Sequence, residues 1–277
     1  MESVYFMNRE QILITGGDGV VGSYIDFGIR TDVATLDVTD PEKVMAVCKE
    51  HMPSAIVHLA AATDLARCEK EPAYAYLVNT AGTYHVALAA RAVGARLIYV
   101  STSGVFDGTK TEPYLPEDMP NPVNIYGHSK YLGELAVAGV LTDYLIVRTS
   151  WIFGGGKQKD NKFIGKILVQ AGAKEVRAVT DKRGSPTYAK DLSRALKKLI
   201  EEGARGVVHV GGGDAARFDI AREALALAGS KAAVIPAVSS DFPGAYGSGA
   251  NESMPLSPLM RPWQEALKEY IETEWKK

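Results

Sequence analysis

Ile12-Leu-Ile-Thr-Gly-Gly-Asp-Gly-Val-Val-Gly22 joins a short apolar run to a turn with glycines at Gly16, Gly19 and Gly22. The apolar run predicts a buried strand, and the glycine spacing predicts a tight turn that lets the backbone approach a pyrophosphate closely. A helix that begins at this turn offers free N–H groups and the positive end of its dipole to the anion. The stretch therefore predicts dinucleotide binding, with an ordinary glycine-rich turn as the alternative.

Short apolar runs and helical patterns alternate along the rest of the chain. Strands are expected at residues 12–14, 55–59, 96–100, 144–147 and 207–210, with a weaker candidate at 33–36. Helices are expected near residues 41–52, 74–93, 125–140, 188–202 and 263–276. Strands that alternate with helices form βαβ units, and buried parallel strands have continuous apolar runs such as these. The fold class is therefore α/β with a parallel sheet.

The character of the chain changes after Phe153. Residues 154–162 form a polar, glycine-rich stretch, and residues 236–262 contain five prolines, so both are expected to be mostly loop. The domain division that we expect is a dinucleotide-binding domain of residues 1–153, which also receives residues 187–211, and a small lobe of residues 154–186 and 212–277.

The composition argues against several functional classes. Lysine and arginine together number 31 against 33 acidic residues, and the net charge of −2 gives no bias toward nucleic acid or an anionic membrane. No apolar run reaches the roughly 18 residues of a transmembrane helix, and the first residues do not resemble a secretory signal. The two cysteines, Cys48 and Cys68, fit packing residues in a reducing compartment. We expect a soluble cytoplasmic protein.

Tyr126-Gly-His-Ser-Lys130 places a tyrosine and a lysine four residues apart, on the same face of the helix expected over residues 125–140. A tyrosine has a pKa of about 10 and is a poor acid or base at neutral pH. A nearby ammonium group favours the phenolate and lowers this pKa, so the pair is a candidate general acid–base. An exposed pair on a solvated helix face is the alternative.

Several motifs resemble, in their order, those of the extended short-chain dehydrogenase/reductase superfamily, and within it the dTDP-4-dehydrorhamnose reductase family of sugar-nucleotide-binding proteins. Thr15-Gly-Gly-Asp-Gly-Val-Val-Gly22 is similar to the family's T-G-x-x-G-x-x-G, and Ser101-Thr-Ser-Gly-Val-Phe-Asp-Gly108 is similar to S-T-D-Y-V-F-x-G. The other motifs lie at residues 37–40, 58–62, 79–80, 126–130, 148–151 and 184–187. The resemblance runs from Gln11 to Leu196, and a weaker similarity is present at residues 263–267.

The resemblance implies a doubly wound parallel Rossmann sheet with a small C-terminal substrate lobe, and it implies that Thr102, Tyr126 and Lys130 are catalytic. A nicotinamide delivers hydride to a carbonyl carbon, and Tyr126 supplies the proton that the forming alkoxide needs. Lys130 lowers the tyrosine pKa and holds the nicotinamide ribose, while the Thr102 hydroxyl polarises the carbonyl. Thr102 follows the strand expected at residues 96–100, at the edge where ligands of open α/β sheets bind.

The binding residues are also implied by the resemblance. Those expected at the cofactor, besides Tyr126 and Lys130, are Gly16, Asp18, Gly19, Val20, Val21, Arg30, Asp37, Val38, Leu59, Ala60, Ala61, Asn79, Val100, Ser101, Thr149 and Ser150. Those expected at a nucleotide-sugar substrate are Thr63, Ser103, Gly104, Trp151 and Arg183.

The cofactor is expected to be NADP or NAD, and the family's frequent use of NADP favours it slightly. Asp37 follows the glycine turn at about the sequence distance at which an acidic residue hydrogen-bonds the ribose 2′-hydroxyl. Arg30 either pairs with a 2′-phosphate, which favours NADP, or is a solvated surface charge. The segment from Gly22 to Asp37 is unusually short for a helix, a strand and a loop, so much of the region that discriminates the two cofactors is missing.

Two residues depart from the family pattern. Ser103 and Gly104 stand where the family has an aspartate and a tyrosine after the catalytic threonine. In the reductases those two side chains help to hold the sugar, so the particular substrate is left open. Sugar-nucleotide dehydratases carry an acid directly after the threonine, and Ser103 cannot replace it, which disfavours dehydratase activity.

Other polar residues have structural as well as functional interpretations. The three lysines within residues 157–162 are either solvated charges or contacts for a nucleotide diphosphate. Trp151 either is a core residue or packs against the sugar, and Arg183 either is a surface charge or touches a phosphate or pyrimidine edge. His58 is expected to be a core histidine. No histidine, cysteine or acidic cluster has metal-ligand spacing, so no active-site metal is expected.

Three functions are compatible with the pattern. The lead hypothesis is an NAD(P)-dependent reductase of a nucleotide-activated 4-keto sugar. The alternatives are a nucleotide-sugar epimerase that keeps its NAD and a non-catalytic regulatory subunit that binds the cofactor and a partner enzyme. Relatives include monomers and also dimers built on the helix that carries Tyr126, so a homodimer and a monomer are both open.

Overall fold

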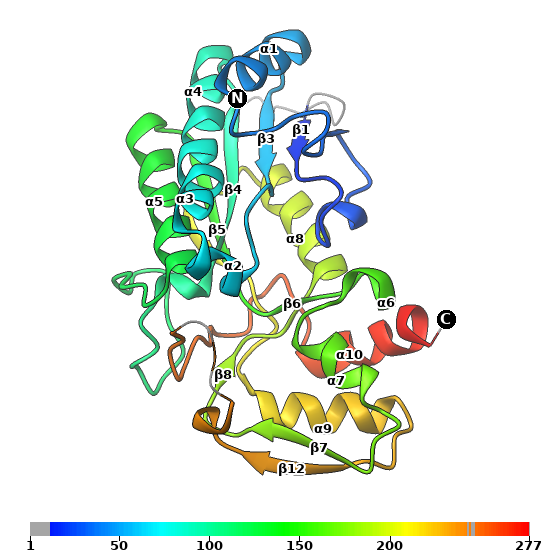
Figure 1. Cartoon of the computed structure of the whole chain (residues 1–277). Coiled ribbons are helices and arrows are strands. Elements are labelled where there is room, and N and C mark those ends of the chain that lie inside the picture. The colour runs from blue at the N-terminus through cyan, green and yellow to red at the C-terminus, as the bar shows by residue number, and fades with distance from the viewer. Residues whose placement is uncertain (1–11, 243, 245–246, 277) are drawn as a thin grey trace.

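The fold is built on one parallel sheet, seen here in a computed structural model that describes residues 12–242, 244 and 247–276. Figure 1 shows the sheet in the upper part of the molecule and a smaller lobe below it. Six parallel strands have the order β10-β5-β4-β3-β1-β2. They are β1 (Ile12–Thr15), β2 (Ile29–Arg30), β3 (Ala55–His58), β4 (Arg96–Thr102), β5 (Tyr144–Thr149) and β10 (Gly206–His209).

Helices cover both faces of this sheet. On one face, apolar residues of the strands pack against α1 (Pro41–His51), α4 (Thr83–Val93) and α5 (Ile125–Val140). The opposite face packs against α8 (Ala189–Glu201). The buried residues of α8 recur every three or four positions, as in Leu192, Ala195, Leu196 and Leu199, which makes one apolar stripe. The predicted doubly wound parallel sheet is therefore confirmed.

Two predictions near the N-terminus are wrong. No strand forms at residues 33–36, because the Asp32 carboxylate accepts hydrogen bonds from the N–H groups of Ala34 and Thr35 and holds this segment in a turn. The sixth strand is instead β2. The helix expected after the glycine turn is also missing, since the turn is followed only by the 3₁₀ turn η2 (Gly22–Tyr24) before β2 begins. The short segment has no room for a full helix.

The helix predicted near residues 74–93 is divided into three parts. These are α3 (Pro72–Tyr76), the π-helical segment η3 (Leu77–Gly82) and α4. The wide π turn carries the buried Asn79, whose side chain accepts a hydrogen bond from Ala62 N and donates one to Ser129 Oγ. Such π segments often occur at functional sites. A further helix that was not predicted, α2 (Leu65–Lys70), is capped by Asp64.

The lobe has an apolar core of its own, distinct from the two layers that flank the sheet. Its helices are α6 (Gly156–Lys159), α7 (Phe163–Val169), α9 (Arg217–Leu227) and α10 (Trp263–Tyr270), which continues into the π-helical segment η6 (Ile271–Trp275). Its strand pairs are β7 (Glu175–Val179) with β12 (Ala233–Ala237), β8 (Arg183–Gly184) with β11 (Ala215–Ala216), and β6 (Ile152–Phe153) with β9 (Thr187–Tyr188). In Figure 1, β7, β12 and α9 lie at the end of the molecule farthest from α1.

Candidate active site

The catalytic residues expected from the sequence lie where β4 ends and α5 begins. Thr102 is the last residue of β4 and pairs in register with Thr149, the last residue of β5. Its Oγ1 accepts a hydrogen bond from Gly104 N at 3.0 Å. The side chain of Asn124 caps α5 by accepting a hydrogen bond from Gly127 N, and this cap orients the first turn of α5, which carries Tyr126.

A close backbone contact brings Tyr126 to Thr102. A Cβ atom placed on Gly127 would lie 1.9 Å from the carbonyl oxygen of Gly104, so only glycine lets α5 approach the loop after β4 so closely. A Cβ atom on Gly104 would lie 3.3 Å from Thr102 Oγ1 and 3.8 Å from Tyr126 Cδ1. The absence of a side chain at Gly104 therefore leaves room beside Thr102 and Tyr126.

The pKa of Tyr126 is set by its surroundings in a way that the sequence did not predict. Burial raises the pKa of Tyr126 to about 12, and the hydrogen bond with Thr102 opposes the rise. The expected lowering of this pKa by Lys130 is wrong in this structure, because the ammonium group turns toward other partners. Lys130 Nζ donates to the carbonyl oxygen of Val100 at 2.8 Å and lies 4.1 Å from the centre of the Tyr99 ring.

Lys130 itself is buried, and desolvation lowers the pKa of its ammonium group to about 7, with the Glu134 carboxylate opposing this shift. Glu134 lies one turn further along α5 and is bound by the guanidinium group of Arg148, from Nε at 3.0 Å and from Nη2 at 2.7 Å. This buried ion pair fastens α5 to β5. It therefore fixes the position of Lys130 relative to the ends of the strands.

The glycine turn forms a cradle that only glycines fit. Gly16 has a φ of +70°, and a Cβ atom there would lie 2.7 Å from the backbone nitrogen of Ala60. A Cβ atom on Gly22 would lie 2.6 Å from the carbonyl oxygen of Gly16. Two hydroxyl groups near the strand ends, Ser101 Oγ and Thr149 Oγ1, are buried without a hydrogen-bond partner in the described part of the chain. A backbone cradle and unpartnered buried donors both fit a dinucleotide.

Arg30 and Asp37 differ in their position relative to this cradle. Arg30 ends β2 and is exposed, and its Nη1 lies 3.4 Å from the carbonyl oxygen of Gly22. Asp37 lies later, in the loop before α1, where its carboxylate accepts hydrogen bonds from the N–H and the hydroxyl of Thr39. Those bonds lower the pKa of Asp37. Arg30, and not Asp37, therefore occupies the end of β2.

The other residues expected at the cofactor surround the same turn. Asn79 holds the loop after β3 through its two hydrogen bonds to Ala62, and Val38 is buried against Gly82. Lys159 donates from the lobe to the carbonyl oxygen of Asp18 at 2.9 Å. The remaining expected residues lie in the turn after β1, in the loop after β3 and at the ends of β4 and β5: Gly19, Val20, Val21, Leu59, Ala60, Ala61, Val100 and Ser150.

The residues expected at the substrate do not all present free side chains. Ser103 is buried and donates its hydroxyl hydrogen to Ser150 Oγ at 2.8 Å. Arg183 pairs with Asp214 on the lobe, and the carbonyl oxygen of Thr63 accepts a hydrogen bond from Lys162. Lys159 and Lys162 thus bridge the lobe to the sheet domain, an arrangement that their sequence did not predict.

Trp151 lies directly after β5 with the unusual φ of +39°. Its ring is covered by Gly184, where a Cβ atom would approach ring atoms to 2.2 Å, and its Nε1 donates to Glu252 Oε2 at 3.3 Å. The guanidinium group of Arg217 lies 4.9 Å from the centre of the Trp151 ring. Glu252 and Arg217 were not expected at the site, because each belongs to a lobe segment without a recognisable motif.

His58 is the buried core histidine that the sequence predicted. Its ring hydrogen-bonds with the hydroxyls of Thr15 and Thr83, and desolvation lowers its pKa to about 3. Cys48 and Cys68 are free and buried. Within the residues that the structure describes, no group of histidine, cysteine and acidic side chains is arranged to hold a metal ion. In the same part of the chain, each helix is too short or too polar to span a bilayer.

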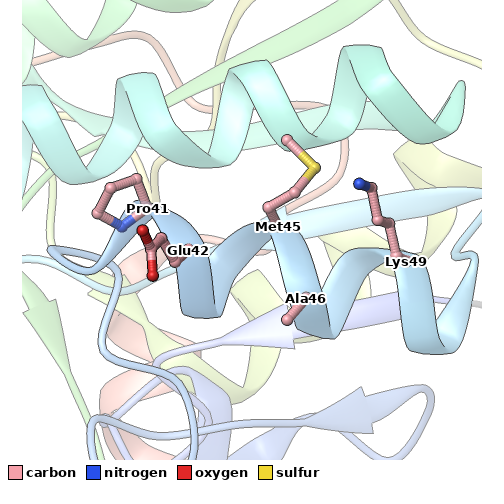
Figure 2. A pocket seen from close by; sticks show the side chains of 5 residues that line it. All are labelled: Pro41, Glu42, Met45, Ala46 and Lys49. Atoms are coloured by element: carbon pink, nitrogen blue, oxygen red, sulfur yellow. The ribbon is translucent and has the colours of Figure 1, made fainter.

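Figure 2 shows a surface hollow along α1, lined by Pro41, Glu42, Met45, Ala46 and Lys49. None of these residues is among those that the sequence predicted for catalysis, cofactor or substrate. We therefore do not connect this hollow with the reaction.

A doubly wound parallel sheet that presents a threonine, a tyrosine and a lysine beside a glycine cradle defines an oxidoreductase of the short-chain dehydrogenase/reductase type. The chain belongs to the family described as the RmlD substrate binding domain, whose model matches residues 10–275. The predicted family and the predicted class of NAD(P)-dependent oxidoreductase are thereby confirmed.

Individual relatives support the same assignment. A dTDP-4-dehydrorhamnose reductase of Mycobacterium tuberculosis is 35% identical, over 93% of this chain and 91% of its own. The crystal structure of dTDP-4-dehydrorhamnose reductase from Bacillus anthracis in complex with NADP has a TM-score of 0.89 and 34% identity, over 96% of this chain and 100% of its own. A UDP-glucose 4-epimerase of Thermus thermophilus, with a TM-score of 0.77 and 21% identity, shares the fold.

Proposed function

We propose that this chain uses NADPH to reduce the C4 carbonyl of a 4-keto-6-deoxy sugar that is carried on dTDP. The observation that carries the proposal is the approach of Tyr126 to Thr102 at the end of β4, with Lys130 one helical turn away. The names of the relatives supply the substrate class, since the dTDP-4-dehydrorhamnose reductases cover most of the chain.

Each catalytic residue has a distinct task in this proposal. When bound, the nicotinamide supplies the hydride that the carbonyl carbon accepts. The Thr102 hydroxyl donates a hydrogen bond to the carbonyl oxygen, and Tyr126 gives its phenolic proton to that oxygen as negative charge develops. A phenol with a pKa of about 12 is protonated throughout the neutral range, as a proton donor must be. Lys130 holds the nicotinamide ribose and orients it.

The chain's own residues fit the cofactor at its other end as well. The backbone N–H groups of the turn from Gly16 to Gly22 would hold the pyrophosphate, and the unpartnered hydroxyls of Ser101 and Thr149 would meet polar groups of the nicotinamide half. The turn lacks a following helix, so backbone donors rather than a helix dipole carry this contact. The lobe of residues 154–186 and 212–277 would bind the nucleotide sugar against the sheet domain.

Arg30 is proposed to bind the 2′-phosphate of NADP. Replacing Arg30 with serine should raise the Kd of NADPH by roughly ten- to a hundredfold, because charge-assisted hydrogen bonds to a phosphate are lost. The Kd of NADH should stay nearly unchanged. Both constants can be measured by cofactor fluorescence, with Arg91→Ser, an exposed arginine on α4, as the charge-matched control. An equal rise in both Kd values, or no rise in either, would show that Arg30 does not recognise the 2′-phosphate.

The proposed reaction is tested by following NADPH absorbance at 340 nm with a set of dTDP-linked 4-keto-6-deoxy sugars. Steady consumption of NADPH with one of them is the expected result. A tightly held NAD⁺ in the purified protein without net consumption of cofactor would identify an epimerase instead. Tight NADPH binding with no turnover on any sugar would favour a regulatory subunit.

A homodimer is proposed on the face formed by α4, α5 and the preceding segment. Leu77, Tyr84 and Leu135 are exposed there, each by more than two fifths, and Leu77 and Tyr84 line one shallow hollow with Ala136 of α5. Leu135→Lys should therefore shift the molecular mass in solution from dimer to monomer, as measured by light scattering. Val169→Lys on α7, which alters an exposed residue of the lobe, should leave the mass unchanged. A wild-type protein that is monomeric at high concentration would contradict this proposal.

A cytoplasmic location is proposed together with this function. It rests on the supply of NADPH that the reaction needs and on the two free, buried cysteines.

A further inference from the structure

Glu252 is held rigidly between the loop after β4 and the strand β8. Its own N–H donates to the carbonyl oxygen of Arg183 at 2.9 Å. The preceding residue, Asn251, donates from its backbone to Gly108 O and from its side-chain amide to the carbonyl oxygens of Lys110, Thr111 and Glu112. The position of Glu252 is therefore determined by the same loop that begins with Thr102.

The carboxylate of Glu252 lies near the ends of β4 and β5, because it accepts a hydrogen bond from Trp151, which follows Thr149, the register partner of Thr102. The charge of Glu252 makes only a minor contribution to the raised pKa of Tyr126, whose main cause is burial. Burial raises the pKa of Glu252 itself, while Arg217, Trp151 and Lys182 oppose this shift. Arg217 is the first residue of α9, Trp151 follows β5 and Lys182 precedes β8.

Glu252 has unused capacity to accept hydrogen bonds. A carboxylate has about four acceptor sites. In the described part of the chain its oxygens accept one hydrogen bond, the long one of 3.3 Å from Trp151 Nε1. A partly buried carboxylate is costly when its acceptor sites lack donors, so a ligand that brings donors is favoured there.

Two features near Thr102 and Glu252 suit a sugar ring. Gly104 places no side chain over Thr102 and Tyr126, and the Trp151 ring forms an apolar wall next to the carboxylate. Aromatic rings pack against the apolar faces of ligands, while polar groups at the edge fix the orientation. Trp151 and Glu252 together therefore offer a flat surface and an acceptor at its edge.

From this geometry we infer that Glu252 is a specificity-determining residue for the sugar, and that its carboxylate accepts hydrogen bonds from ring hydroxyl groups while the ring lies beside Trp151. The inference rests on the proposed function, because it assumes that the sugar nucleotide binds at Thr102 and Tyr126. The guanidinium group of Arg217, which lies over the rings of Trp151 and Phe163, opposes the rise in the pKa of Glu252 that burial causes.

The test compares Glu252→Gln with the wild-type protein in both binding and turnover. Calorimetry measures the Kd of dTDP and of dTDP-rhamnose, a reduced sugar nucleotide, and their ratio reports the contribution of the sugar. In Glu252→Gln this ratio should fall about tenfold or more, the loss typical of hydrogen bonds to a charged group, while the Kd values of dTDP and NADPH stay unchanged. The KM for the keto sugar should rise by a similar factor.

A pH profile separates a local electrostatic effect from a structural one. Removal of the Glu252 charge removes one cause of the raised Tyr126 pKa, so the alkaline limb of kcat should move to lower pH in Glu252→Gln. Glu112→Gln, an exposed glutamate on the neighbouring loop, should change neither the pH profile nor the binding ratio.

The outcomes distinguish this inference from the proposed function. An unchanged binding ratio in a folded Glu252→Gln protein overturns the inference, whether or not the wild-type protein turns over. A parallel loss of dTDP, NADPH and sugar binding also overturns it, since that pattern indicates a structural role. Loss of the sugar contribution in a protein that consumes no NADPH supports the inference and rejects the reductase.

Discussion

Replacement of Tyr126 by phenylalanine should lower kcat for NADPH-dependent reduction by about a hundred- to ten-thousandfold, the usual contribution of a well-placed general acid. The change removes one hydroxyl group and leaves the ring, which packs beside Ala62, Cys68 and Ala75, in place. The Kd of NADPH should therefore remain close to that of the wild type. Stopped-flow absorbance at 340 nm and cofactor fluorescence measure the two quantities separately.

Tyr131→Phe provides the control for this prediction. Tyr131 lies on the same helix α5 but packs against Val105, Phe106 and Tyr114, away from the catalytic pair. It should retain nearly full activity. A Tyr126→Phe protein with wild-type kcat would reject Tyr126 as the proton donor.

Replacement of Gly16 by alanine should weaken NADPH binding by roughly ten- to a hundredfold, the loss expected when hydrogen bonds to a charged group are displaced. The new Cβ atom would lie within 2.9 Å of backbone atoms of both Leu59 and Ala60, so the turn and the loop after β3 must separate. Both segments are expected to contact the cofactor. The free energy of unfolding should fall as well, because alanine at a φ of +70° is strained.

Gly94 offers a closely matched control, since its φ of +71° is nearly the same. No described atom lies within 4 Å of a Cβ atom placed there. Gly94→Ala should therefore lose about 1 kcal/mol of stability from backbone strain and bind NADPH normally. Chemical denaturation and cofactor titration of both variants separate strain from displacement. Equal NADPH affinity in the two variants would show that the contact between the turn and the loop does not matter for the cofactor.

Local sequence patterns were sufficient for the sheet and for the helix that carries Tyr126 and Lys130. The buried strands at Ile12–Thr15, Ala55–His58 and Tyr144–Thr149 have apolar runs that the parallel sheet requires on both faces. The spacing of Tyr126 and Lys130 belongs to one turn of a regular helix, so it too is a local property. These features depend on few neighbours, and the sequence predicts them well.

The segment after the glycine turn shows where local patterns fail. Its glycines and valines are compatible with a strand, a turn and a helix, and only the early return of the chain into the sheet at Ile29 leaves no room for a helix. Likewise, Val33 and Leu36 look like strand residues, but the Asp32 side chain competes for the backbone and forms a turn. The short chain between β1 and β2 decided the first case, and competition between side-chain hydrogen bonds and sheet pairing decided the second.

By itself, the sequence determined that this protein has a parallel α/β sheet, a glycine turn for a dinucleotide and a tyrosine–lysine pair on one helix. Only the tertiary structure decided what surrounds that pair. Burial raises the Tyr126 pKa to about 12, and Lys130 is directed to Val100 and Tyr99. Glu252 reaches the site from more than a hundred residues away. Burial and long-range contacts depend on how distant segments pack, and a local sequence pattern does not determine that packing.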